Sequence, residues 1–137
     1  MTFDFRPSTR FSMNITVFGG SQPREGDSAY NEAMELGRLL AQRGHTVLTG
    51  GYIGTMEAVS RGASEAGGHV IGVTCEDIEN WRKVAPNRWV KEERRWKTLL
   101  ERLQGLIDGC DAKDILSAFM AIDLSTGCDF KCSAICV

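Results

Sequence analysis

The feature that most constrains the fold is a repeated order of short apolar run, glycine turn and helical segment. "NITVF" (14–18) is a β-branched and aromatic run that ends in Gly19-Gly20, as does a buried strand that enters a turn. The same order recurs in "HTVLTGG" (45–51), and "HVIGVT" (69–74) supplies a third run. These three runs predict three strands.

The segments between the runs show helical spacing instead. From Asp27, and again from Met56, apolar residues recur every three or four positions, and Gly44 and Gly67 mark where the helices end. The two sets are Ala29, Ala33, Leu36 and Leu40, then Met56, Val59, Ala63 and Ala66. Strands that alternate with helices predict a parallel sheet with right-handed crossovers and helices on its faces. The predicted fold class is therefore α/β, a Rossmann-like three-layer fold.

The pattern loosens after Thr74. Residues 75–95 mix charges with Trp81, Trp89 and a lone Pro86 and keep no period, so we predict a long, partly ordered connection that forms a solvated lid or an interface segment. A strong helical pattern then returns over 96–107 and ends near Gly109. Its apolar positions are Leu99, Leu100, Leu103 and Leu106.

Composition excludes several functional classes. The 137 residues fit one domain, 1–137, and a net charge of -2 argues against a nucleic-acid partner. No apolar run reaches the roughly 18 residues of a membrane span, so we expect a cytoplasmic protein without a membrane partner. The five cysteines are typical of reduced thiols rather than of a disulfide framework. We expect no metal and no cofactor.

Two glycine loops are the candidate binding elements. "FGGSQPREGDS" and "TGGYIGTME" follow the first two predicted strands, and ligands of open parallel sheets sit at the carboxyl ends of strands. Glycines let the backbone approach an anion, helix N-termini attract phosphate, and Ser21 and Thr55 offer hydroxyl groups. The alternative is that both glycine pairs serve only as turns. Spacing alone leaves the two interpretations even, and neither loop has the dinucleotide or P-loop pattern.

Three stretches together resemble the LOG family, also known as lysine-decarboxylase-like proteins. They are "VFGGS", "LTGGYIGTMEAVSRGASEAGGHVIGV" and "LLERLQGLIDGCDA", and the resemblance covers about residues 14–112. Characterised members are phosphoribohydrolases that cleave a nucleoside 5'-monophosphate, such as AMP or a cytokinin nucleotide, into free base and ribose 5-phosphate. A related member carries the molybdenum cofactor. The resemblance also implies a homodimer.

The resemblance assigns residues to a nucleotide pocket. Its lining would be Gly19, Gly20, Ser21, Gly50, Gly51, Gly54 and Met56. Arg102 lies nine residues before Asp111, where the family's catalytic arginine precedes an Asp-Ala strand. The alternative for Arg102 is a solvated helix residue that pairs with Glu101 or Asp108.

The sequence departs from the family after residue 112. The family continues into P-G-G-x-G-T-x-x-E, which holds the 5'-phosphate and supplies a glutamate, whereas this chain reads "DAKDILSAFMAIDLSTGCDFKCSAICV". Glycosidic cleavage needs a carboxylate near the sugar, so we expect weak or no hydrolase activity. The alternative function is a non-catalytic module that binds a nucleotide or the molybdenum cofactor.

The divergent tail, 113–137, raises two further expectations. Its abrupt change of character suggests truncation or a shifted reading frame, which translation of the coding DNA in all three frames tests. Its thiols are spaced C-x3-C-x3-C, one residue longer than an iron–sulfur motif of radical enzymes, so we expect buried or incidental cysteines rather than a cluster. They are Cys128, Cys132 and Cys136.

Overall fold

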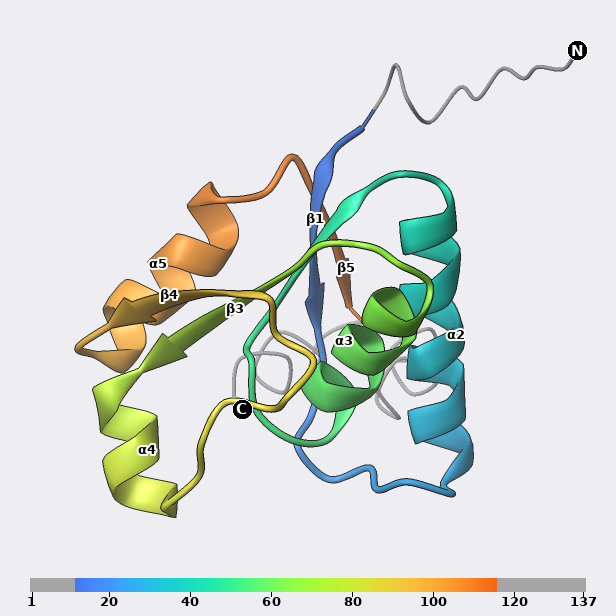
Figure 1. Ribbon diagram of the computed structural model, residues 1–137. Coiled ribbons are helices and arrows are strands. Elements are labelled where there is room, and N and C mark those ends of the chain that lie inside the picture. The colour runs from blue at the N-terminus through green and yellow to red at the C-terminus, as the bar shows by residue number, and fades with distance from the viewer. Residues whose placement is uncertain (1–11, 116–137) are drawn as a thin grey trace, which may run out of the picture.

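The computed structural model describes residues 12–115, and its centre is a parallel sheet of five strands (Figure 1). The strand order is β4-β3-β2-β1-β5, and every neighbouring pair is parallel. The predicted α/β fold class is confirmed. The strands are β1 (Asn14–Phe18), β2 (Thr46–Thr49), β3 (Val70–Cys75), β4 (Glu92–Trp96) and β5 (Ala112–Ile115).

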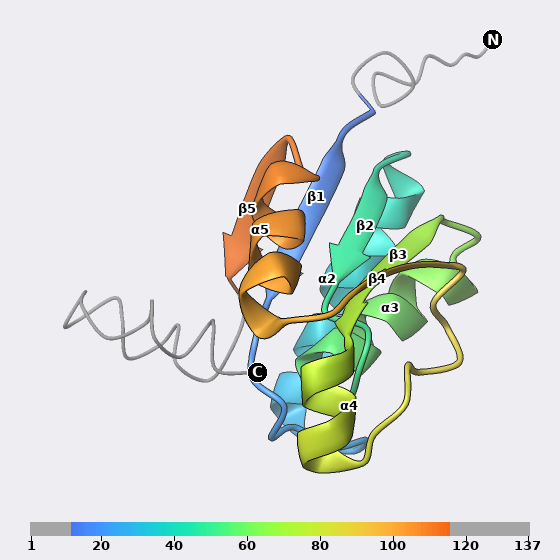
Figure 2. The same cartoon turned by 90° about the vertical axis from the view of Figure 1, so that its left-hand side faces the viewer.

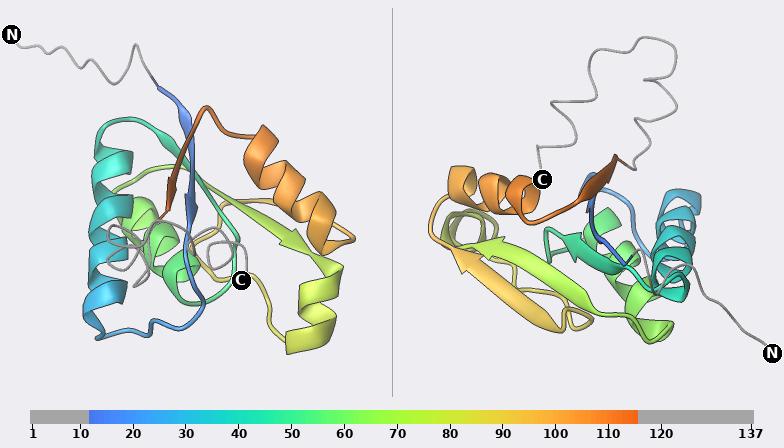
Figure 3. Two further views of the ribbon diagram at one scale, coloured as in Figure 1. Left: turned by 180° about the vertical axis from the view of Figure 1, so that it is seen from behind. Right: turned by 90° about the horizontal axis from the view of Figure 1, so that it is seen from above.

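Helices cover both faces of the sheet, which gives the three predicted layers. α2 (Ser28–Gln42) and α3 (Thr55–Glu65) lie on one face, and α5 (Leu99–Asp108) lies on the other, as Figures 2 and 3 show. The short α4 (Glu76–Arg82) follows directly on the end of β3. The three predicted helices and the three predicted strands are all present, with ends shifted by only a few residues.

The face under α2 and α3 carries the larger apolar core. Alternate residues of the strands, such as Ile15, Val17 and Val47, pack there against the two helices. The helices themselves cross closely, because a Cβ at Gly62 would lie 2.0 Å from the Met34 carbonyl oxygen. A side chain at this crossing would force the helices apart, so the glycine is a packing requirement here.

The opposite face is covered by α5. Leu106 packs with Leu48 and Val73, and the Thr16 hydroxyl donates a hydrogen bond of 2.8 Å to the Leu106 carbonyl. A capping box between Thr98 and Glu101 fixes where the helix begins. The predicted apolar stripe is only partly correct, because Leu100 is 74% exposed.

The predicted long connection over 75–95 is wrong in part, since it contains α4 and the beginning of β4. α4 has only seven residues, of which Ile78 alone is buried, so no helical period could appear. β4 is an edge strand of sequence EERRW whose residues are mostly exposed, and it therefore lacks the apolar alternation of a half-buried strand. Between them, Asn87 donates to the carbonyls of Gly51 and Tyr52 at 2.8 Å, which fixes the remaining loop over the end of β2.

None of the helices in the described part of the chain has the length and apolar character that a membrane span requires. The first three residues of the divergent tail, 113–115, belong to β5, whereas the tail cysteines and the rest of the tail lie outside residues 12–115.

Candidate functional site

The two predicted glycine loops meet where the parallel strands end, which we call the carboxyl edge. The N–H of Thr55 donates a 3.0 Å hydrogen bond to the carbonyl of Gly20. Gly54 has a φ of +79°, and a Cβ there would lie 2.5 Å from Ser21 Cα. A side chain at this position would push the loops apart, so the local sequence allows a contact that other residues would prevent. Gly19 lies in the same loop and is buried.

Gly50, Gly51 and Met56 form the second part of the predicted set. A Cβ at Gly50 would lie 2.0 Å from Nη2 of Arg102 and 2.3 Å from the Met56 sulfur. The sulfur is itself 3.6 Å from Arg102 Nη2. Gly51 turns the chain with a φ of +84° and packs on Gly72 of the neighbouring strand. The structure therefore brings all eight predicted site residues to one edge of the sheet, and their binding roles stay predictions.

Arg102 is buried, with 3% of its surface exposed. Its Nε donates to the Val73 carbonyl at 2.8 Å and its Nη2 to the Gly50 carbonyl at 3.0 Å. The solvated alternative, with pairing to nearby acids of the same helix, is wrong. Arg102 lies three residues after Leu99 and four before Leu106, so its place on the apolar face of the helix was a signal that the sequence already held.

The charge of Arg102 has no partner of opposite sign in the described residues. None of the salt bridges within 12–115 includes this guanidinium. Burial lowers the pKa of Arg102, although an arginine remains protonated at neutral pH. The ring of Tyr52, whose centroid is 5.4 Å from the guanidinium carbon, gives partial compensation.

A second arginine that the sequence analysis missed lies at the same edge. Nη1 of Arg82, at the end of α4, is 3.3 Å from the Ser21 hydroxyl oxygen. Arg24 stiffens the first loop, because its Nη1 donates to the carbonyls of Ser21, Gln22 and Pro23. No periodic signal marks Arg82, because its place depends on a helix too short to show a period.

The arrangement can bind an anion more readily than it can transfer a proton. Glu57, at the start of α3, accepts a 2.9 Å hydrogen bond from the Tyr30 hydroxyl. Glu79 is bonded to Tyr52 and Arg95. Neither carboxylate contacts Arg102, and residues 12–115 contain no cluster of histidine, cysteine and acidic side chains that could hold a metal ion.

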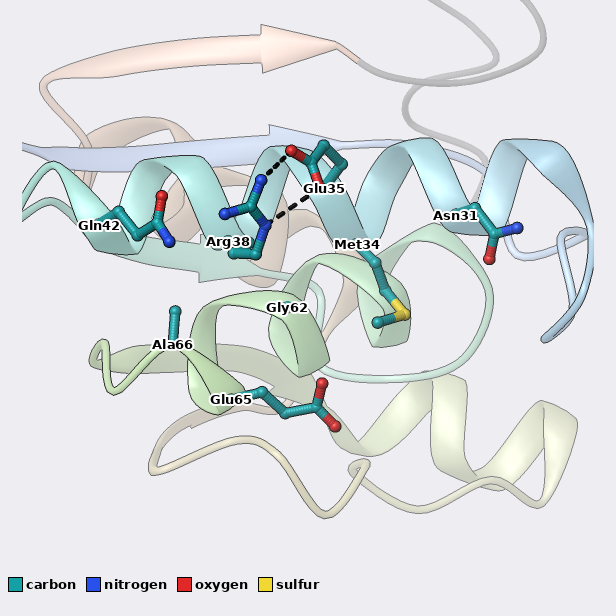
Figure 4. Close-up of a pocket in the computed structure, with 8 residues that line it drawn as sticks. All are labelled: Asn31, Met34, Glu35, Arg38, Gln42, Gly62, Glu65 and Ala66. Atoms are coloured by element: carbon teal, nitrogen blue, oxygen red, sulfur yellow. Dashed lines mark hydrogen bonds and ion pairs between the residues drawn. The ribbon is translucent and has the colours of Figure 1, made fainter.

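Two surface grooves lie away from this edge. One, of about 440 Å³, runs between α2 and α3 and is lined by Met34, Arg38 and Glu65 among others (Figure 4). The other, of about 320 Å³, lies between β4 and α5 and includes Trp96. Neither contains a predicted site residue, so we place the site by its glycines and guanidinium groups instead.

Comparison with known families and sequences confirms the resemblance drawn from the sequence. The SLOG cluster4 family matches residues 12–85, which is more than half of the chain. An uncharacterized protein of Archaeoglobus fulgidus is 38% identical over 76 residues, and the match covers 51% of this chain and 49% of the relative. A probable cytokinin riboside 5'-monophosphate phosphoribohydrolase of rice, LOGL5, is 41% identical over 65 residues, covering 47% and 26%. The matches thus span about half of one relative and a quarter of the other.

Solved structures of the same fold include two proteins that handle the molybdenum cofactor. The molybdenum cofactor binding protein of Rippkaea orientalis aligns with a TM-score of 0.64 at 25% identity, covering 85% of this chain and 72% of that one. The molybdenum cofactor carrier protein of Chlamydomonas reinhardtii aligns with a TM-score of 0.52 at 30% identity, covering 62% and 50%.

Proposed function

This chain belongs to the SLOG cluster4 family, and we propose that the carboxyl edge of its sheet binds the phosphate group of a nucleoside monophosphate. The observation that carries the proposal is the buried guanidinium of Arg102, which has no carboxylate partner in residues 12–115. Taking an unpaired charge out of water costs several kcal/mol. A phosphate would supply the missing opposite charge.

The surroundings of Arg102 suit an anion. The glycine loops expose backbone near Ser21, and α3 begins at the same edge with its N-terminal N–H groups. Arg82 adds a second guanidinium beside the Ser21 hydroxyl. Guanidinium groups bind phosphate oxygens through planar, charge-assisted hydrogen bonds.

Phosphoribohydrolase activity is the second candidate, and the similarity to the probable phosphoribohydrolase of rice favours it. Cleavage of the N-glycosidic bond would need a carboxylate near the ribose. Two candidates near this edge, Glu57 and Glu79, are engaged with Tyr30, Tyr52 and Arg95. We therefore propose binding as the main function and weak or no turnover, with the molybdenum cofactor as an alternative ligand because the similar folds include its carriers.

Calorimetric titration of the full chain with AMP, adenosine and inorganic phosphate tests the proposal. We expect saturable binding of AMP and much weaker binding of adenosine, because only AMP carries the phosphate. An assay for ribose 5-phosphate, with AMP and a prenylated AMP as substrates, tests for turnover. Equal affinity for AMP and adenosine, or no binding of AMP at millimolar concentration, would overturn the phosphate site.

The carrier alternative needs its own comparison. The protein is titrated with molybdenum cofactor in the absence and presence of saturating AMP. Competition between the two ligands supports one shared site at the carboxyl edge. Binding of the cofactor that AMP does not affect would separate the carrier function from this edge.

A further inference from the structure

Tyr52 contacts both Arg102 and a carboxylate, Glu79. Its ring centroid is 5.4 Å from the guanidinium carbon of Arg102, and its hydroxyl oxygen is 3.0 Å from Oε2 of Glu79. Only 2% of the surface of Tyr52 is exposed, so its side chain makes both contacts from a buried position. One side chain thus touches both a buried positive charge and a negative charge without joining them.

The hydroxyl group of Tyr52 is fixed at the junction of β3 and α4. It accepts a 3.0 Å hydrogen bond from the N–H of Cys75 and lies 3.1 Å from the Cys75 carbonyl oxygen. A phenol has one proton, which it donates to either this carbonyl or the Glu79 carboxylate. Burial raises the pKa of Tyr52 to about 12, so the ring remains neutral and supplies no counter-charge to Arg102.

Glu79 is held by another arginine. Nη1 of Arg95 lies 2.8 Å from Oε2 of Glu79. The hydrogen bond from Arg95 lowers the pKa of Glu79, so the carboxylate stays ionised and paired at neutral pH. Removal of the Tyr52 ring would leave space through which this carboxylate could approach Arg102.

We infer that Tyr52 is a positioning residue, which holds the Arg102 guanidinium against the Gly50 and Val73 carbonyls and keeps Glu79 from pairing with it. An arginine held in this way keeps its charge available to a phosphate. The consequence for ligand affinity rests on the proposed function, whereas the consequence for the position of Arg102 does not. The two can therefore be tested separately.

The position of Arg102 is tested by hydrogen exchange of its Nε–H group, measured by NMR and assigned through the loss of its signal in Arg102→Lys. This proton is bonded to a buried carbonyl, so it exchanges slowly in the wild type. Tyr52→Phe keeps the ring and should keep the protection. Tyr52→Leu removes the ring. We expect the Nε–H of Arg102 to exchange about tenfold faster or more in this variant, which is the scale of a buried cation–π contact.

Tyr30→Leu is the matched control, since Tyr30 is also a buried tyrosine with a hydroxyl bonded to a glutamate. It should lower stability without changing exchange at Arg102. Unchanged protection in Tyr52→Leu, or an equal loss of protection in Tyr30→Leu, would overturn the positioning role.

Affinity for AMP gives the second readout. We expect Tyr52→Phe to bind within about threefold of the wild type and Tyr52→Leu about tenfold more weakly. Adding Glu79→Gln to Tyr52→Leu should recover part of the loss, because the competing carboxylate is gone. No recovery would refute the exclusion of Glu79. A wild type that protects Arg102 yet binds no AMP leaves the positioning role standing and refutes the proposed function.

Discussion

Replacing Arg102 by methionine separates a binding role from a structural one. Methionine is a long, flexible and apolar side chain that can occupy much of the same space beside Met56. The substitution removes the hydrogen bonds to Val73 and Gly50 and also removes the buried charge. We expect AMP affinity to fall while the free energy of unfolding changes little.

The magnitude follows from whether the buried charge is paired. Breaking a buried ion pair costs about 3–5 kcal/mol, because the remaining partner is left uncompensated. Arg102 has no such partner in residues 12–115, so its removal leaves two carbonyls without a donor but relieves the desolvation of a charge. These opposing contributions are each several kcal/mol, and we expect a net change within about 2 kcal/mol of zero.

Binding has no comparable compensation. A hydrogen bond to a charged group contributes about 1.5–3 kcal/mol, so loss of the guanidinium should weaken AMP binding by about 10- to 150-fold. Any turnover should fall further, since a charge that develops in the transition state is affected more than the ground state. Calorimetry gives the affinity, and urea denaturation gives the free energy of unfolding.

Arg38→Met is the control, because Arg38 is half-exposed and, within the described part of the chain, pairs with Glu35 alone on the surface of α2. It should leave the affinity unchanged and alter stability by less than about 1 kcal/mol. A loss of more than about 4 kcal/mol in Arg102→Met with normal AMP affinity would refute the reasoning. Such a result would mean that Arg102 is a paired structural residue.

Three further predictions concern stability, each measured by urea or thermal denaturation. Gly54→Ala should destabilise the protein by more than about 2 kcal/mol, since the Cβ would lie 2.5 Å from a backbone atom. The control is Gly67→Ala, which has a φ of +85° but open space around the Cβ and should cost only about 1–2 kcal/mol. Equal losses of stability in the two variants would argue against the loop contact. Thr98→Ala should cost about 0.5–2 kcal/mol through loss of the capping box, and no change would show that the cap is dispensable. The pKa of Glu79 is lowered by Arg95, so the stability it contributes is present above its ordinary pKa near 4.5 and is lost as the pH falls through the lower folded value. Glu79→Gln should flatten the acid limb of the stability profile, and an unchanged limb would contradict this.

The fold could be predicted from the sequence because each buried strand or helix leaves an apolar period in its own stretch of the chain. Ile15, Val17 and Val47 belong to strands whose apolar runs are continuous, since a parallel strand with helices on both faces is buried on both sides. The elements that escaped prediction are α4, β4 and β5, and the first two of these bury little of their surface. A segment that buries almost nothing leaves no apolar period in its sequence.

The site divides in the same way. Ligands of parallel sheets sit at the carboxyl ends of the strands, so the sequence alone predicted both glycine loops as candidate binding elements. The resemblance to the family added Arg102, and its spacing from Leu99 and Leu106 already placed it on the apolar face of its helix. What that guanidinium meets could not be known, because its acceptors on Gly50 and Val73 are 52 and 29 residues away along the chain.

The sequence alone therefore determined the first three strands and the three longer helices, and it predicted the edge at which a ligand would lie. Only the tertiary structure decided that Arg102 is buried with no carboxylate partner among residues 12–115, that the Tyr52 ring contacts it, and that Arg82 lies beside Ser21. The physical reason is the separation along the chain of the residues that interact. Hydrophobic periods are properties of neighbours along the chain, whereas the pairing of a charge depends on which distant segments fold against it.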